Sequence, residues 1–97
     1  MNPVTIIERH AAELRALGAR KIGVFGSFAR GEESPHSDVD VYLEFLDGHK
    51  TYDNFYGIHE LLQGPFGRPI DIVTDGSLNE RKARLILPTV HYAAIDA

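Results

Sequence analysis

The chain has 97 residues, of which 43% are hydrophobic, and this length predicts one domain with a single core spanning residues 1–97. Its formal net charge of −4 argues against binding a long nucleic acid, for which a basic face is expected. It has no cysteine, which excludes disulfides and thiolate metal sites, and no signal peptide or long apolar segment, so we expect a cytoplasmic protein without membrane contact.

The first segment predicts a helix followed by a buried strand. Asn2 can cap a helix that begins at Pro3 and ends at Gly18. One apolar stripe at helical spacing runs along it, formed by Val4, Ile7, Ala11, Leu14 and Leu17. The next residues, 21–25, are largely apolar and predict a short buried strand.

A glycine–serine turn follows this strand. Gly26–Ser27 leads into residues 28–30, which can form a helical turn, so backbone N–H groups are exposed at a helix start. Such N–H groups favour phosphate, and glycine lets a phosphate approach the backbone closely. The segment is not a Walker A loop, because Glu32–Glu33 stand where Lys and Ser or Thr are required. An ordinary turn is the alternative.

Residues 38–45 predict a strand with one acidic and one apolar face. Asp38 and Asp40 are two residues apart and should project from the same side. The opposite phase is apolar and should face a core; it consists of Val39, Val41, Leu43 and Phe45. Paired carboxylates repel unless a cation lies between them, and Mg²⁺ typically binds one or two protein carboxylates together with phosphate oxygens. The pattern therefore predicts a metal carried by a nucleotide, unless Ser37–Asp38 is only a loop that hydrogen-bonds its own backbone.

A second helix and a second acidic strand come next. Residues 51–63 predict a helix that stops at Gly64–Pro65, and residues 69–73 predict an apolar strand containing Asp71. If this strand lies beside residues 38–45, Asp71 can join the other two carboxylates. The helix has an aromatic stripe of Tyr52, Phe55, Tyr56, His59 and Leu62. We interpret this stripe as core or partly exposed interface rather than as a platform for adenine.

The last twenty residues predict a helix over 78–87, an interruption at Pro88 and a closing strand over 90–93. The basic cluster Arg81–Lys82 and Arg84 lies on the predicted helix. We interpret it as a solvated face rather than a nucleic-acid contact.

The glycine–serine turn and the acidic strand together form one pattern: Gly26–Ser27, Ala29–Gly31 and, after six intervening residues, Asp38 and Asp40. This pattern resembles the signature of the MNT-type minimal nucleotidyltransferases. These belong to the polymerase-β-like nucleotidyltransferase superfamily, and the likeness covers nearly the whole chain. It implies an α/β (α+β-like) fold with a small mixed β-sheet flanked by helices. The segment Leu87–Thr89 departs from the family, whose minimal members often have a charged residue before the closing strand.

The resemblance implies roles for individual residues. Gly26 and Ser27 would bind the triphosphate of ATP, and Asp38 and Asp40 would be ligands of Mg²⁺. Asp71 would help to activate the attacking hydroxyl, as a general base or as a ligand of the catalytic metal. No protein nucleophile is needed, since nucleotidyl transfer depends mainly on positioning and charge stabilisation.

Two further residues near the motif have open interpretations. Arg30 could steady the phosphates, or it could pair with Glu32 or Glu33 on the surface. His36, in the segment before the two aspartates, could contact substrate.

Stand-alone chains of this size resemble the antitoxin of HEPN/MNT toxin–antitoxin pairs, whose partner is a helical HEPN RNase. The resemblance implies AMP transfer from ATP to a tyrosine hydroxyl of that toxin. One alternative is an antitoxin that only binds its partner stoichiometrically, although a pure binder has no need for three repelling carboxylates. Another alternative is nucleotidyl transfer to a small molecule.

Overall fold

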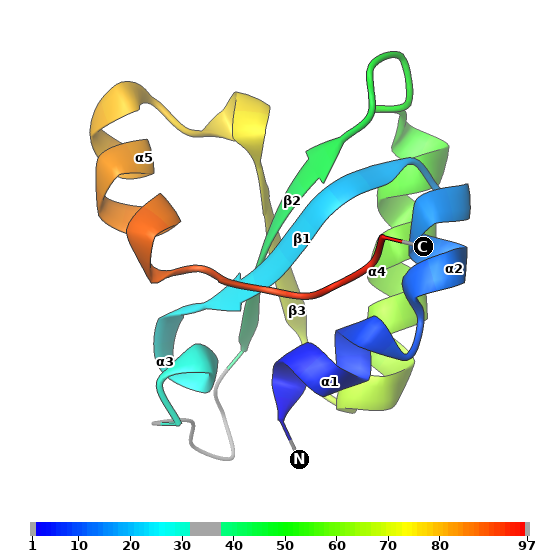
Figure 1. Ribbon diagram of the computed structural model, residues 1–97, viewed down its shortest axis with the longest axis horizontal. Helices are drawn as coiled ribbons and strands as arrows, with labels where there is room; N and C mark the ends of the chain where they lie inside the picture. The colour runs from blue at the N-terminus through cyan, green and yellow to red at the C-terminus, as the bar shows by residue number, and fades with distance from the viewer. Residues whose placement is uncertain (1, 32–37, 97) are drawn as a thin grey trace.

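The computed structural model describes residues 2–31 and 38–96, and within them a four-stranded sheet forms the centre of the molecule (Figure 1). Its strands are β1 (Ala19–Phe25), β2 (Val39–Phe45), β3 (Ile70–Thr74) and β4 (His91–Tyr92), in the spatial order β3-β2-β1-β4. β1 pairs antiparallel with β2 and with β4, whereas β2 and β3 are parallel. This mixed sheet with flanking helices confirms the predicted fold class.

Helices cover one face of the sheet. α1 (Pro3–Glu8) and α2 (Ala11–Ala16) pack on β1, and α4 (Tyr52–Phe66) packs against β3 and α1. α3 (Gly26–Ala29) is a short turn of helix at the end of β1, and α5 (Glu80–Ile86) stands on the other side of the sheet (Figure 1). None of the described helices is of the length and apolar character that a bilayer crossing requires.

The core lies between the sheet and these helices. The side chains predicted to face it from β2 are buried, from Val39 through Val41 and Leu43 to Phe45. They meet apolar side chains of β1 and of the helices, all fully inaccessible to solvent: Ile7, Leu14, Ile22, Val24, Ile58 and Leu62. Strand alternation places Asp40 on the opposite face of β2, where Asp40 is partly exposed and the next residue of the same phase, Tyr42, is buried.

The first helix differs from the prediction of one continuous helix. It divides into α1 and α2 at Arg9–His10, where the His10 N–H bonds to the Ile7 carbonyl at 3.0 Å, a tighter i−3 bond. Ile7 and Leu14, on either side of the break, are both fully buried as the stripe predicted. No proline or glycine marks the break, so apolar spacing alone could not locate it.

The second helix ends later than predicted. α4 continues through Pro65 to Phe66 and is capped by Gly67, whose φ of 65° lies in the left-handed region. Phe66 packs against the core, which favours the extra turn even though Pro65 has no N–H to donate to the carbonyl of Leu61.

The aromatic stripe of α4, predicted to be core or partly exposed interface, is core over only part of its length. The buried face is centred on Ile58 and Leu62, with Phe55 partly buried against them. Tyr52 and Tyr56 lie off this face and are 82% and 59% exposed, so they are not core.

The C-terminal segment follows the predicted order of helix, interruption and strand. After β3, the short 3₁₀ turn η1 (Asp75–Ser77) leads to α5, and a second, η2 (Leu87–Thr89), contains Pro88. β4 is shorter than predicted, yet the chain beyond it still packs on the body, because Ile95 is buried and the Ala94 N–H bonds to Glu8 Oε2 at 2.6 Å.

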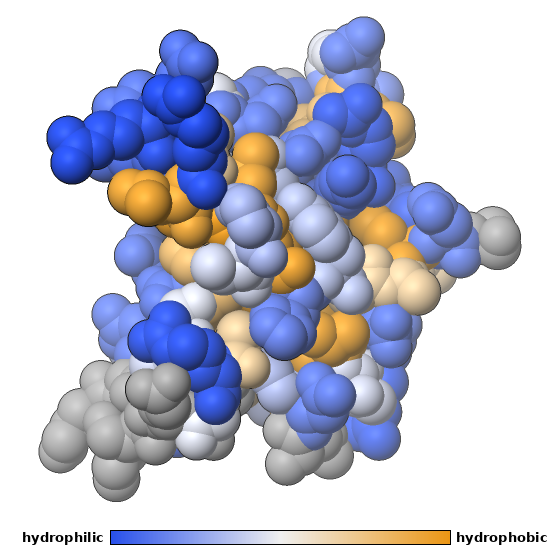
Figure 2. All heavy atoms as spheres, turned by 60° about the vertical axis from the view of Figure 1, so that its left-hand side comes forward, coloured by the Kyte–Doolittle hydropathy of each residue, from blue (hydrophilic) through white to orange (hydrophobic). Residues whose placement is uncertain are grey.

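α5 has no buried residue, and the three basic side chains predicted to be solvated are exposed. Figure 2 shows this side of the molecule, with hydrophilic atoms at the upper left, where α5 projects, and apolar atoms between them and the centre.

Candidate active site

The turn after β1 contains Gly26. Both the backbone conformation at this position and the atoms next to it require glycine. Its φ is +77°, a left-handed conformation that other residues adopt at a cost. A Cβ added at this position would lie 2.3 Å from Oδ2 of Asp40 and 3.2 Å from its Cγ. The backbone of the predicted phosphate turn therefore lies directly against the carboxylate of Asp40.

Strand pairing brings the second and third predicted carboxylates together. β2 and β3 are in parallel register with Asp40 opposite Asp71, and the Val39 N–H bonds to the Pro69 carbonyl at 2.9 Å. On its other side Asp40 is opposite Phe25, the residue before Gly26. Asp40 thus lies between the glycine turn and Asp71, on the face of the sheet opposite the core.

The electrostatics of Asp40 reflect this crowding. Burial raises the pKa of its carboxyl, and the neighbouring charges of Asp71 and Asp38 raise it further. The Arg30 guanidinium acts in the opposite direction, so Arg30 also lies within electrostatic reach of the site. A bound cation among the carboxylates would relieve the repulsion.

The remaining predicted residues lie around this centre. Ser27 is the second residue of α3, directly after Gly26, and Asp38 is exposed immediately before β2. Ser37, His36 and the alternative partners of Arg30, Glu32 and Glu33, lie outside the described residues.

The three carboxylates suit a Mg²⁺ ion that arrives bound to a nucleotide better than a Mg²⁺ ion held by protein ligands alone. Carboxylate oxygens are the ligands that this hard cation prefers. Within residues 2–31 and 38–96, no three His, Asp or Glu side chains form a ready-made metal cluster. Mg²⁺ is commonly held by one or two carboxylates together with substrate phosphates, and the open arrangement of Asp38, Asp40 and Asp71 suits that mode. The phosphates would complete the site.

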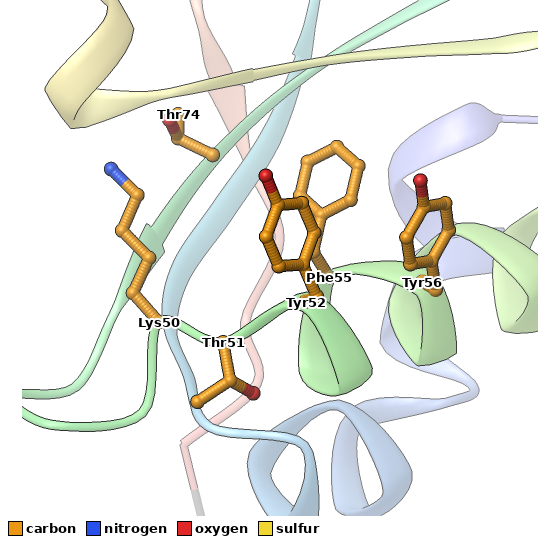
Figure 3. Close-up of a pocket in the computed structure, with 6 residues that line it drawn as sticks. All are labelled: Lys50, Thr51, Tyr52, Phe55, Tyr56 and Thr74. Carbon is orange, nitrogen blue, oxygen red and sulfur yellow. The ribbon is translucent and has the colours of Figure 1, made fainter.

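The sequence did not anticipate two features of the structure. The contact between Gly26 and Asp40 joins segments 14 residues apart, and only the register of β1 with β2 creates it. A concavity, lined in part by Lys50 and Tyr52, lies at the other end of β2 and β3 (Figure 3). The exposed aromatic residues of α4 were its only signal in the sequence.

Comparison with known proteins gives a consistent result. The family model described as "Nucleotidyltransferase domain" matches residues 7–91, which include all six predicted site residues. The protein adenylyltransferase MntA of Thermococcus cleftensis is 37% identical over 89 residues, covering 91% of this chain and 89% of that protein. A predicted protein adenylyltransferase of Methanocaldococcus jannaschii is 31% identical over 74 residues, covering 75% of this chain and 85% of that protein.

A solved structure agrees with the sequence comparisons. It is described as that of a predicted minimal nucleotidyltransferase and superposes with a TM-score of 0.76 at 32% identity, covering 94% of this chain and 95% of that one. The family match, the relatives and the shared architecture lead to one conclusion. The chain belongs to the nucleotidyltransferase domain family and is a minimal nucleotidyltransferase enzyme.

Proposed function

We propose that this enzyme transfers AMP from ATP to a tyrosine hydroxyl of a partner HEPN RNase toxin in the cytoplasm, and so acts as an antitoxin. Two observations support protein adenylylation. The Thermococcus relative, at 37% identity, is named a protein adenylyltransferase. The acidic face of the sheet is also open, because Asp38 and Asp71 are exposed and a large acceptor can approach them.

The reaction is an in-line displacement at the α-phosphorus of ATP. The acceptor oxygen forms a new bond to that phosphorus, the bond from the α-phosphorus to the bridging oxygen breaks, and pyrophosphate leaves. The tyrosine hydroxyl loses its proton in the same process. Asp71 is the carboxylate assigned to activating this hydroxyl, either by accepting the proton or as a metal ligand.

The chain's own residues position the nucleotide. Gly26 and Ser27 present backbone N–H groups and a hydroxyl to the phosphates, and Arg30 adds positive charge on the same side. Asp38, Asp40 and Asp71 would hold Mg²⁺, which supplies charge neutralisation to the triphosphate and favours ionisation of the acceptor hydroxyl.

The observation that carries the proposal is the position of Asp40. Its carboxylate lies between the Gly26 backbone and the opposing Asp71. The residues proposed to bind nucleotide, to ligate the metal and to activate the hydroxyl are therefore neighbours. Such preorganisation is what phosphoryl transfer requires from a protein.

The test is incubation of the purified chain with Mg²⁺, ATP and the product of the adjacent gene, followed by intact-mass measurement of both proteins. We expect the mass of the partner to increase by whole AMP units. The Asp38→Asn/Asp40→Asn variant should produce no such increase. Asp47→Asn, an exposed carboxylate in the loop after β2, is the matched control and should transfer normally. No mass gain, with the double variant still neutralising its partner at equimolar ratio, would instead indicate a binding antitoxin.

A further inference from the structure

A concavity of about 350 Å³ lies at the end of the sheet away from Asp40 (Figure 3). Its volume is at the lower end of the range typical of small-molecule pockets, about 300–1,000 Å³. The start of α4, the loop before it and the end of β3 contribute its walls. The lining residues are Lys50, Thr51, Tyr52, Phe55, Tyr56 and Thr74.

This concavity is separate from the candidate active site. Thr74 lies three residues beyond Asp71 on β3, which corresponds to roughly 10 Å along the strand. Side chains three apart in a strand also point to opposite faces, and Thr74 is buried whereas Asp71 is exposed. In Figure 1 the loop before α4 is at the top and α3 is at the bottom. A molecule in the concavity would therefore not contact the Asp40 carboxylate.

One wall of the concavity is aromatic. The rings of Tyr52 and Tyr56 are nearly parallel, with centroids 6.3 Å apart and an interplanar angle of 20°. Phe55 meets Tyr56 edge to face at 5.9 Å. Tyr52 is 82% exposed and Tyr56 59% exposed, so this ring surface is available to a ligand and is not needed by the core. Exposed aromatic rings of this kind can stack on a planar heterocycle.

A cation lies at the other side of the concavity. The ammonium of Lys50 is close to Gly76 in η1, where an added Cβ would lie 2.4 Å from Nζ. Among the residues that the structure describes, Lys50 has no hydrogen-bond or ion-pair partner. None of the described residues that line the concavity is a carboxylate, and Lys50 gives this lining a positive charge. The aromatic wall and the ammonium together favour a planar ring that carries an anionic group.

We propose that this concavity binds a nucleoside monophosphate, with the base against Tyr52 and Tyr56 and the phosphate at Lys50. A single cation balances one phosphate group better than a triphosphate, and the volume suits a ligand of this size. The hydroxyl of Thr74 lies in the same walls and offers a hydrogen bond to the sugar or base, whereas the Thr51 hydroxyl caps α4 by accepting from the Asn54 N–H at 3.1 Å. The site is additional to the catalytic one and does not depend on the proposed adenylylation.

The test is an NMR titration of the full chain with AMP in EDTA, in the Asp40→Asn background. Adenosine and ribose 5-phosphate are titrated in parallel. We expect saturable shifts of the amides of residues 50–56 and 74–76 with AMP and, more weakly, with adenosine, and no such shifts with ribose 5-phosphate.

Variants separate the two contacts. Tyr52→Ala should weaken AMP binding about tenfold, because one stacking surface is lost, whereas Tyr52→Phe keeps the ring and should bind nearly as tightly as the parent. Lys50→Met should weaken AMP about threefold to fivefold and leave adenosine unchanged. Tyr52 is exposed, so these changes should leave the fold intact.

Three results would overturn the proposal. The first is the absence of saturable shifts in these segments, and the second is AMP binding that Tyr52→Ala does not weaken. The third is concentration-dependent self-association that Tyr52→Ala abolishes in sedimentation velocity, which would assign the aromatic surface to a protein interface. Each result can be read without measuring adenylyl transfer, so it is distinguishable from failure of the proposed function.

Discussion

Substitution of Gly26 by alanine tests the contact on which the site depends. The change has two separable costs. The first is backbone strain, because φ is +77° and an L-residue in the left-handed region loses about 1 kcal/mol. For a domain of this size that loss lowers the melting temperature by about 4–8 °C.

The second cost falls on Asp40. The new Cβ would be 2.3 Å from Oδ2, and ordinary contact begins at 3.4 Å, so the carboxylate oxygen must move by the difference of 1.1 Å. Misplacement of a catalytic group by about 1 Å can reduce a rate by about 100-fold, equivalent to about 2.7 kcal/mol of transition-state stabilisation. We therefore expect Gly26→Ala to lose about 100-fold in AMP transfer and to bind Mg·ATP more weakly.

Gly48→Ala is the matched control. Gly48 has a φ of +78° and nothing within 4 Å of an added Cβ, so the variant carries the same backbone strain without the contact. Thermal unfolding followed by circular dichroism should give similar decreases for the two variants. Transfer rates and Mg·ATP affinity, measured well below both melting temperatures, should fall only for Gly26→Ala. Activities within about threefold of each other would refute the role assigned to the contact.

Three further predictions concern stability. Burial and two neighbouring carboxylates raise the pKa of Asp40, so its ionised form costs folding free energy at pH 7. In EDTA, the Asp40→Asn variant should therefore be about 0.5 kcal/mol more stable to unfolding, which corresponds to a melting temperature about 2–4 °C higher. A lower melting temperature for the variant would contradict this. Burial would raise the pKa of Glu44, but the hydrogen bonds that Tyr42, at 2.7 Å, and Arg20 donate to its carboxylate lower this pKa overall. Its stabilisation is therefore present above the unfolded-state pKa of about 4.3 and lost as the pH falls through the lowered folded value. Urea unfolding should show Glu44→Gln about 1 kcal/mol less stable at pH 7, with the gap closing at pH 3; a gap independent of pH would be inconsistent with this reasoning. Leu62→Ala should cost about 2–5 kcal/mol by denaturant unfolding, against less than about 0.5 kcal/mol for the exposed Leu85→Ala, and equal losses would contradict the assigned core.

Much of the fold could be predicted from local patterns, because those patterns encode burial directly. Alternation along β2 predicted which of its side chains reach the core, and residues 70–74 form the expected parallel partner strand. The break at His10 and the extension of α4 through Pro65 could not be predicted. They depend on tertiary packing, which overrides the usual start and stop signals.

The candidate site shows the same division. Residue types and spacing indicated Asp38, Asp40 and Asp71 as site residues. Whether Asp71 lies beside the other two depends on which strands pair, and the spacing does not report that. The parallel register supplies that placement, and the contact of Gly26 with Asp40 arises from a separate, antiparallel pairing. The concavity beside Lys50 depends on loop and helix geometry that apolar periodicity does not report.

Substoichiometric turnover distinguishes an adenylyltransferase from a binding antitoxin. The partner protein is mixed with one tenth of an equivalent of the enzyme, Mg²⁺ and ATP, and its modified fraction and RNase activity are followed over time. We expect all of the partner to acquire AMP and lose activity, and EDTA or Asp40→Asn to prevent both. Inhibition that needs equimolar protein and proceeds without nucleotide would contradict this expectation, because a stoichiometric binder alone behaves in that way.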